Sequence, residues 1–194
     1  MIAPVTRGRS LPHFDTEVRL QLERQRSSRP VQIVVPPATE RRITMRRALP
    51  KDAGGIHALT EQFVGDGLLL PRTLEQVNRT IRDYVIAIEG GRVVACGALR
   101  IYSSQTAEVG ALAVASNCQG LGLGRHVVEA LVEDARLLGI EQVFALTLQV
   151  EFFAKVGFTP TAIAQFPEKI AADCNQCSRK AHCVEVAVAR TLTV

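Results

Sequence analysis

Glycine occupies every second position from Gly120 to Gly124, at a junction between two regular elements. Before this stretch, apolar residues alternate over residues 107–114, as in a half-buried strand. After it, apolar residues recur at helical spacing from Val127, and Gly139 is a suitable residue to end that helix. Glycine lets the backbone turn tightly, and the first N–H groups of a helix have no partner within it. The junction therefore favours a phosphate or pyrophosphate ligand, the alternative being a turn without a ligand.

Two common phosphate-binding loops do not fit this stretch. A Walker loop continues with Lys and then Ser or Thr after its last glycine, whereas Arg125 and His126 follow here. A dinucleotide-binding fingerprint has the spacing GxGxxG, whereas the spacing here is GxGxG. The pattern of Gln119, Gly122 and Gly124, after a strand with the run Leu-Ala-Val, instead resembles the acetyl-CoA loop of the GNAT acyltransferases. A cation in the first helical turn opposes the helix dipole, and a bound anion would offset that cost.

The size and composition of the chain fit one domain with an extension. The chain has 194 residues, of which 47% are hydrophobic, so it can bury a substantial core. Its longest apolar runs are too short to span a bilayer and no secretory signal is visible, so we expect no membrane association. The five cysteines are an odd number, which favours a reduced, cytoplasmic setting over a disulfide framework.

Positive charge is concentrated at the start of the chain. The net charge is +4, yet residues 1–47 alone hold ten arginines and only four acidic residues. We therefore expect a basic N-terminal arm, residues 1–41, which is partly helical or disordered, and a domain over residues 42–194. Nucleic-acid binding would need aromatic side chains among these arginines, and only Phe14 is present, so we expect no nucleic-acid partner. The arm can either pack on the domain or exchange with a second subunit, which leaves a homodimer open.

The order of the elements predicts a mixed α/β sheet. Residues 43–46 have the pattern of a first strand, and two helices follow, beginning near residues 50 and 73. Alternating apolar residues predict three antiparallel strands, at residues 84–89, 92–102 and 107–114. After the central helix we expect a strand, a short helix and a final strand, at residues 142–148, 151–155 and 184–191. A helix between two strands of one sheet implies a crossover connection.

Residues 43–192 resemble the GNAT fold throughout, which implies a mixed, mostly antiparallel sheet with a V-shaped splay, flanked by helices. A narrower resemblance, to the short stand-alone N-acetylglutamate synthases, rests on residues 67–72, on residues 144–158 and on the Cys-containing C-terminal segment 166–184 with the strand after it. It implies transfer of acetyl from acetyl-CoA to the α-amine of L-glutamate, the first step of arginine biosynthesis, by direct attack without an acyl-enzyme. Two alternatives stay open: another amine acceptor such as glutamine, and a non-catalytic acetyl-CoA sensor.

The resemblance also implies which residues bind acetyl-CoA. Backbone N–H groups of Leu112, Ala113 and Val114, on the splayed strand, would hold the pantetheine, and that of Leu112 would act as a catalytic donor to the acetyl oxygen. Phe153 stands where many GNAT enzymes carry a tyrosine that acts as general acid, so it would pack beside the cofactor or in the core. The pyrophosphate would lie on the glycine-rich loop, formed by Gln119, Gly120, Leu121, Gly122, Leu123, Gly124 and Arg125.

The acceptor side of the site is assigned in the same way. Glu108 matches by position a glutamate that several GNAT enzymes carry on this strand, so it would act as general base through water. A salt-bridged carboxylate without a catalytic role is the alternative reading of Glu108. An acidic amino acid also needs cations for its carboxylates, and the candidates that border the acceptor cleft in this fold are Arg72, Arg100 and Lys169.

Three cysteines, Cys174, Cys177 and Cys183, have part of the spacing of a metal site. His182 is a candidate fourth ligand, but adjacent ligands at positions 182 and 183 fit a tetrahedral site poorly. We therefore expect no metal, and interpret the cysteines as reduced thiols or a redox-sensitive pair, with structural zinc as the alternative.

Overall fold

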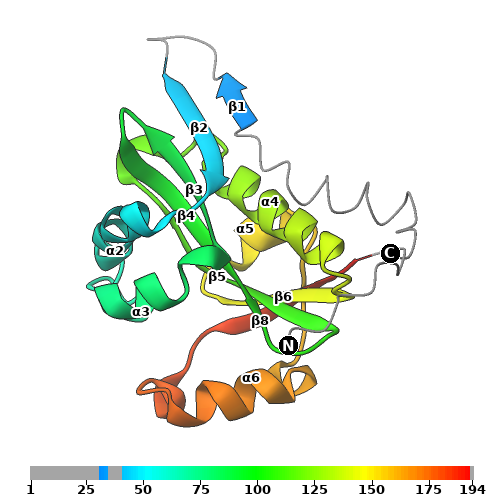
Figure 1. Cartoon of the computed structure of the whole chain (residues 1–194). Coiled ribbons are helices and arrows are strands. Elements are labelled where there is room, and N and C mark those ends of the chain that lie inside the picture. The colour runs from blue at the N-terminus through cyan, green and yellow to red at the C-terminus, as the bar shows by residue number, and fades with distance from the viewer. Residues whose placement is uncertain (1–30, 35–40, 193–194) are drawn as a thin grey trace, which may run out of the picture.

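The computed structural model describes residues 31–34 and 41–192, and Figure 1 shows how its elements are arranged. An eight-stranded sheet forms its centre, with the strand order β1-β2-β3-β4-β5-β6-β8-β7. Neighbouring strands are antiparallel, except that β5 and β6 are parallel. The strands are β1 (Val31–Val34), β2 (Arg42–Arg47), β3 (Tyr84–Glu89), β4 (Arg92–Ile101), β5 (Thr106–Val114), β6 (Gln142–Thr147), β7 (Thr159–Pro160) and β8 (Val186–Thr191).

Helices cover both faces of the sheet (Figure 1). Helices α2 (Ala53–Glu61) and α3 (Leu74–Arg79) pack on one face, and α4 (Leu123–Leu137) and α5 (Val150–Ala154) pack on the other. The short helix α6 (Pro167–Ala172) precedes two 3-10 turns, Cys174–Gln176 and Lys180–His182. No helix in the described ranges is long and apolar enough to cross a membrane.

Five of the six residues predicted to form the apolar stripe of α4 lie in the core and are 0% exposed. Leu138, which we expected to continue the stripe, lies beyond the end of α4 and is 53% exposed. The buried members of the stripe are Val127, Val128, Leu131, Val132 and Ala135. Because α4 connects the parallel strands β5 and β6, it forms the predicted crossover.

Local sequence signals explain several element ends. The Thr73 side chain accepts a hydrogen bond from the Gln76 amide at 3.2 Å, and the Thr73 amide donates to the Gln76 side chain at 2.8 Å. The two residues form a capping box at the start of α3, close to the helix start expected near residue 73. The final strand begins later than predicted, at Val186. Val184 precedes it and is 74% exposed, so it does not share the buried face of that strand.

Strand β1 is the part of the predicted N-terminal arm that the structure describes. It pairs antiparallel with β2, from Val31 opposite Met45 to Val34 opposite Arg42. β1 is therefore an edge strand of the sheet. It belongs to the fold although it precedes residue 42, where we expected the domain to begin. The rest of the predicted arm, residues 1–30 and 35–40, lies outside the described residues, as does the end of the predicted domain at residues 193–194.

The middle of β5 separates from both of its neighbours. Its parallel pairing with β6 covers only Thr106 to Glu108. On the other side, the register with β4 shifts between Cys96 and Ala98, and Ala111 adopts a positive φ of 49°. This β-bulge and the loss of pairing produce the expected splay, which leaves backbone groups of β5 available to a ligand.

Candidate active site

The glycine-rich loop has the geometry of an anion site. Gly120 and Gly122 both have a φ of +77°, a conformation that side-chain-bearing residues rarely adopt. Gly122 is the N-cap of the 15-residue helix α4, and no side chain caps that end. Within the described residues, the N–H groups of residues 120–122 donate to no backbone carbonyl. The loop and the helix dipole therefore offer unpaired donors to an anion.

Contacts with β5, α4 and α5 hold the glycine-rich loop in place. Gln119 donates from its side chain to the Val114 carbonyl at 3.2 Å, and Arg125 is exposed in the first turn of α4. His126 Nδ1 lies 2.9 Å from the Gly122 carbonyl. A Cβ on Gly124 would lie 3.4 Å from the Phe152 ring, so α5 packs within van der Waals contact of the start of α4.

Arg41 holds the turn at Ser116–Cys118 that precedes the loop, a role that sequence reasoning missed. Its guanidinium donates to both carboxylate oxygens of Glu89, at 2.6 and 2.9 Å, to the Asn117 carbonyl at 3.1 Å and to Cys118 Sγ at 3.3 Å. The bidentate contact with Glu89 raises the pKa of Arg41 and lowers that of Glu89. Cys118, which had no assigned role, is fully buried in this arrangement.

The bulge on β5 presents free backbone where the acetyl group was expected. Ala111 and Leu112 have no register partner on β4 or on β6, whereas Ala113 pairs with Cys96 and Val114 with Ala95. The unpaired backbone is thus centred on residues 111 and 112, at the start of the predicted stretch Leu112–Val114.

Phe153 lies in the core with 4% of its surface exposed. It makes edge-to-face contacts with Phe152 and Phe158, at ring centroid distances of 5.3 and 5.1 Å. Of the two placements predicted for this side chain, the structure shows packing in the core.

A cluster of polar side chains lies at the start of β5. Lys169 Nζ donates to Glu108 Oε2 at 2.8 Å and to Asp173 Oδ2 at 3.0 Å. The Tyr102 hydroxyl lies 2.9 Å from Glu108 Oε2 and also contacts Asp173 Oδ2. Arg100 donates to the same Asp173 oxygen at 2.7 Å. The positive charges of Lys169 and Arg100 therefore compensate the negative charges of Glu108 and Asp173. This cluster is largely buried, since Glu108 is only 8% exposed.

The surroundings shift the pKa values of this cluster in a consistent way. Burial acts to lower the pKa of Lys169, but the carboxylates of Glu108 and Asp173 outweigh it and raise that pKa. Burial acts to raise the pKa of Asp173, but the hydrogen bonds from Tyr102 and Lys169 outweigh it and lower that pKa. Burial, followed by the adjacent carboxylates, raises the pKa of the Tyr102 phenol. Lys169 is thus charged, Asp173 ionised and Tyr102 neutral near neutral pH.

Tyr102 and Asp173 are cluster members that sequence reasoning missed. Tyr102 immediately follows β4, two residues after Arg100, so strand alternation directs both side chains to one face. The register places Arg100 opposite Glu108. Lys169 and Asp173 are four residues apart, one helical turn. Strand alternation and helical spacing could have grouped each pair, but the hydrogen bonds between the two pairs join residues 71 and 73 positions apart.

Arg72, the third predicted cation, lies outside this cluster. It is half-buried, and within residues 41–192 no carboxylate lies within ion-pair distance of it. The loop before it is held by Arg179, which donates to the carbonyls of Gly67 and Leu69 at 2.7 and 3.0 Å. The C-terminal segment therefore fixes both the base candidate and the loop that leads to Arg72.

The three C-terminal cysteines differ in exposure. Cys174 and Cys177 are half-buried and Cys183 is exposed, all three as free thiols. Within residues 31–34 and 41–192, no group of three or more His, Cys, Asp or Glu side chains is arranged to hold a metal ion. Burial raises the pKa of Cys174, which makes its thiol less reactive.

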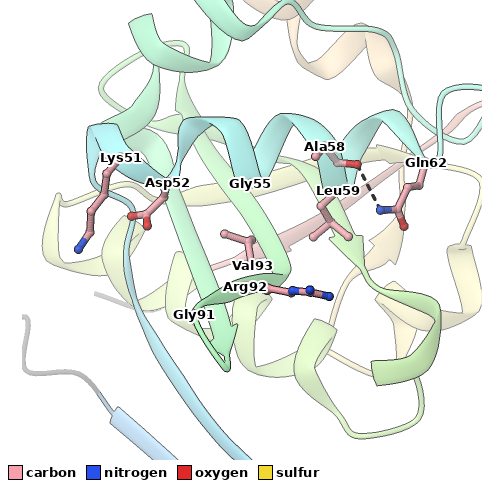
Figure 2. A pocket seen from close by; sticks show the side chains of 9 residues that line it. All are labelled: Lys51, Asp52, Gly55, Ala58, Leu59, Gln62, Gly91, Arg92 and Val93. Atoms are coloured by element: carbon pink, nitrogen blue, oxygen red, sulfur yellow. Dashed lines mark hydrogen bonds between the residues drawn. The ribbon is translucent and has the colours of Figure 1, made fainter.

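A pocket of about 340 Å³ lies elsewhere, between α2 and the β3–β4 hairpin (Figure 2). Its polar lining includes Lys51, Asp52, Gln62 and Arg92. None of the predicted site residues borders it. Asp52 is already paired with Arg46 at 2.6 Å, so this pocket offers no convergent set of reactive groups.

Comparison with known sequences identifies the family. Residues 57–158, more than half of the chain, match the family model described as the acetyltransferase (GNAT) family. An uncharacterized N-acetyltransferase of Chlorobaculum tepidum is 35% identical over 148 residues, which are 76% of this chain and 96% of that relative. An amino-acid acetyltransferase of Mycobacterium tuberculosis is 34% identical over 140 residues, which are 71% of this chain and 72% of that relative.

Solved structures agree with this assignment. N-acetylglutamate synthase from Neisseria gonorrhoeae, solved with coenzyme A and N-acetyl-glutamate, has a TM-score of 0.70 at 25% identity. That match covers 82% of this chain but only 37% of the synthase. A Mycobacterium tuberculosis protein solved with CoA has a TM-score of 0.68 at 28% identity and is covered to 99%. With the glycine-rich loop and the splayed strand, these matches show that the chain belongs to the acetyltransferase (GNAT) family and is an acetyl-CoA-dependent acyltransferase.

Proposed function

We propose that the protein transfers the acetyl group of acetyl-CoA to the α-amine of L-glutamate, and so supplies the first step of arginine biosynthesis. The observation that carries this proposal is the position of Glu108, the last residue of β5 that pairs with β6. Its carboxylate therefore lies where the two strands begin to separate. The names of the relatives support an amino-acid acceptor, and the N-acetyl-glutamate complex of the gonococcal synthase supports glutamate.

The proposed reaction is a direct transfer between two bound substrates. The pyrophosphate lies on the N–H groups of the glycine-rich loop, and the free backbone of residues 111 and 112 polarises the thioester carbonyl. Glu108 takes a proton from the substrate ammonium, and the neutral amine that results attacks that carbon. A C–N bond replaces the C–S bond, and the nitrogen loses its second proton as the amide forms. The departing thiolate takes a proton from solvent, so no tyrosine at the position of Phe153 is needed.

An acyl-enzyme is not part of this proposal. Cys96 is the cysteine closest to the bulge, with its Sγ 3.5 Å from the Ala111 carbonyl. Burial raises the pKa of Cys96 to about 12, so the thiol is almost entirely protonated at neutral pH. Since the thiolate is the nucleophilic form of cysteine, Cys96 is a poor acceptor for the acetyl group.

Substrate recognition is proposed to rest mainly on Arg72. Arg100 and Lys169 already contact the carboxylates of Asp173 and Glu108. Arg72 lies near the Tyr84 phenol, and within residues 41–192 no carboxylate is within ion-pair distance of it. The side chain of Arg100 is 42% exposed and uses one nitrogen in its ion pair, so its other donors can assist. A planar guanidinium suits bidentate binding of a carboxylate.

The test compares the kinetics of Glu108→Gln and Arg72→Gln with the wild-type protein. Loss of a general base lowers kcat by about 100-fold or more, so Glu108→Gln should lower kcat with little change in KM for acetyl-CoA. Arg72→Gln should raise KM for L-glutamate. Arg79→Gln is the matched control, because Arg79 lies on α3 and its side chain is 74% exposed. Wild-type kinetics in both variants would refute these roles.

A further inference from the structure

We propose that Lys169, Tyr102 and Asp173 are positioning residues for Glu108. Lys169 and Tyr102 engage its Oε2 and Asp173 holds those two side chains, so that Oε1 is the oxygen that takes the amine proton. This inference rests on the proposed role of Glu108 as general base and deepens it. It also gives Lys169 a role other than binding of the substrate carboxylate.

The two oxygens of Glu108 have different surroundings. Oε2 contacts both Lys169 Nζ, at 2.8 Å, and the Tyr102 hydroxyl, at 2.9 Å. Among the hydrogen bonds of residues 41–192, none involves Oε1. Oε1 is also absent from the fully buried polar atoms without a partner in that part of the chain, so it keeps contact with accessible space. One oxygen is thus fixed and the other is open.

Asp173 supports this arrangement without touching Glu108. Its Oδ2 accepts from Lys169 and from Arg100, and it contacts the Tyr102 hydroxyl. A phenol has one proton, which Tyr102 shares between two carboxylates, while the ammonium of Lys169 donates to both of them. Lys169 therefore compensates for the repulsion that two adjacent carboxylates would otherwise create.

Aromatic packing fixes the helix that carries two of these residues. Phe166 immediately precedes α6 and stacks on Phe144 of β6, with ring centroids 3.9 Å apart and an interplanar angle of 13°. Phe166 is 1% exposed. Phe144 is the register partner of Glu108, so the anchor of α6 lies beside the residue that α6 positions. Packing holds Lys169 and Asp173 over Glu108 even though α6 is short.

The chemistry of the step follows from these contacts. The N–H bond of the substrate breaks, an O–H bond forms at Glu108 Oε1, and the nitrogen lone pair is freed for attack. Lys169 keeps its proton, because its carboxylate neighbours raise its pKa, so it acts through charge and position and not as an acid. Other titratable groups that face this cluster are Arg100, Cys174 and Glu185.

The first test compares Asp173→Asn and Tyr102→Phe with Glu168→Gln. Glu168 is the matched control, because it is an exposed carboxylate on the same helix. We expect kcat to fall about tenfold in the two cluster variants, a fraction of the full contribution of a general base, with KM for acetyl-CoA unchanged. If the cluster variants have the kinetics of Glu168→Gln, the inference is wrong.

The second test measures the pH profile of kcat/KM in two variants of opposite charge change. If these residues had only a structural role, the two variants would not move the acid limb of the profile in opposite directions. Lys169→Met removes a positive charge beside Glu108, so the acid limb should move to higher pH. Asp173→Asn removes a negative charge from the same cluster, so the acid limb should move to lower pH. Unmoved limbs in Asp173→Asn would overturn the inference even if Lys169→Met does not fold.

The outcomes separate this inference from the proposed function. If the wild-type protein acetylates an amine other than glutamate, the substrate assignment fails, and the same variants test the inference with that amine. If glutamate is the substrate and the variants behave like the control, only the inference fails. If no amine is acetylated, both fail together.

Discussion

Lys169 on α6 and Glu108 on β5 form an ion pair of 2.8 Å between side chains that are each 11% exposed. Pairs buried to this degree depend on geometry, because the loss of hydration must be offset by contacts on both partners. Asp173 and Tyr102 supply those further contacts. The pair therefore links the stability of the C-terminal segment to the candidate catalytic residue.

Replacing Lys169 with methionine should lower stability substantially. The change leaves Glu108 and Asp173 close together without their shared cation, and breaking a buried pair on one side costs about 3–5 kcal/mol. Urea unfolding gives the free energy of unfolding directly. Lys155→Met is the control, since Lys155 is exposed and forms no ion pair within residues 41–192. If Lys169→Met lowers the free energy of unfolding no more than the control does, the ion pair of Lys169 with Glu108 contributes little to stability.

Asp52→Asn should destabilise the protein at neutral pH and have less effect in acid. The hydrogen bond from Arg46, opposed by burial, lowers the pKa of Asp52 below its usual 3.8. Stability from this carboxylate is therefore present above about pH 4 and is lost as the pH falls through the lower, folded-state pKa. Unfolding at about pH 7 and about pH 3 measures the difference between variant and wild type. Asp66→Asn, at an exposed position, is the control; a pH-independent difference for Asp52→Asn would contradict the assignment.

Gly122→Ala should weaken acetyl-CoA binding, because its φ of +77° strains any residue with a Cβ by about 1 kcal/mol and distorts the loop. Gly139→Ala is a matched control: Gly139 has a φ of +73° at the other end of α4 and does not touch the loop. Calorimetry with acetyl-CoA compares their affinities. Both variants should lose similar stability, and only Gly122→Ala should lose affinity. Equal affinities would argue against the loop as the pyrophosphate site.

Arg179→Met should release the loop before Arg72, because it removes two hydrogen bonds to the carbonyls of Gly67 and Leu69. We expect a rise in KM for L-glutamate of about tenfold, the factor that corresponds to about 1.4 kcal/mol, with KM for acetyl-CoA unchanged. Lys180→Met, the exposed neighbour, is the control. An equal change in both KM values would indicate general damage instead.

Features with a local signature could be predicted from the sequence. The alternation of β5, the stripe of α4 and the glycines between them specify a strand, a loop and a helix, and Thr73 with Gln76 specifies a capping box. Each of these signals acts over a few residues, through backbone conformation or side-chain period. The anion-binding shape of the loop follows from the same local rules.

The composition of the polar cluster could not be predicted in the same way. Glu108 and Lys169 were each selected, but for different roles, because nothing local shows that residues 61 positions apart share a hydrogen bond. Arg41 was taken as the end of an arm, yet its contacts reach Glu89 and the loop at Asn117. Such roles depend on tertiary packing, in this case on the stacking of Phe166 against Phe144.

The central claim is tested most directly by measuring thiol release from acetyl-CoA with L-glutamate, L-glutamine, L-aspartate, L-ornithine and a polyamine as separate acceptors. Our account predicts saturable release with L-glutamate in preference to the others, and loss of that preference in Arg72→Gln. Release with another amine but not with L-glutamate would contradict the substrate assignment. Binding of acetyl-CoA without release for any acceptor would contradict the enzymatic account and favour an acetyl-CoA sensor.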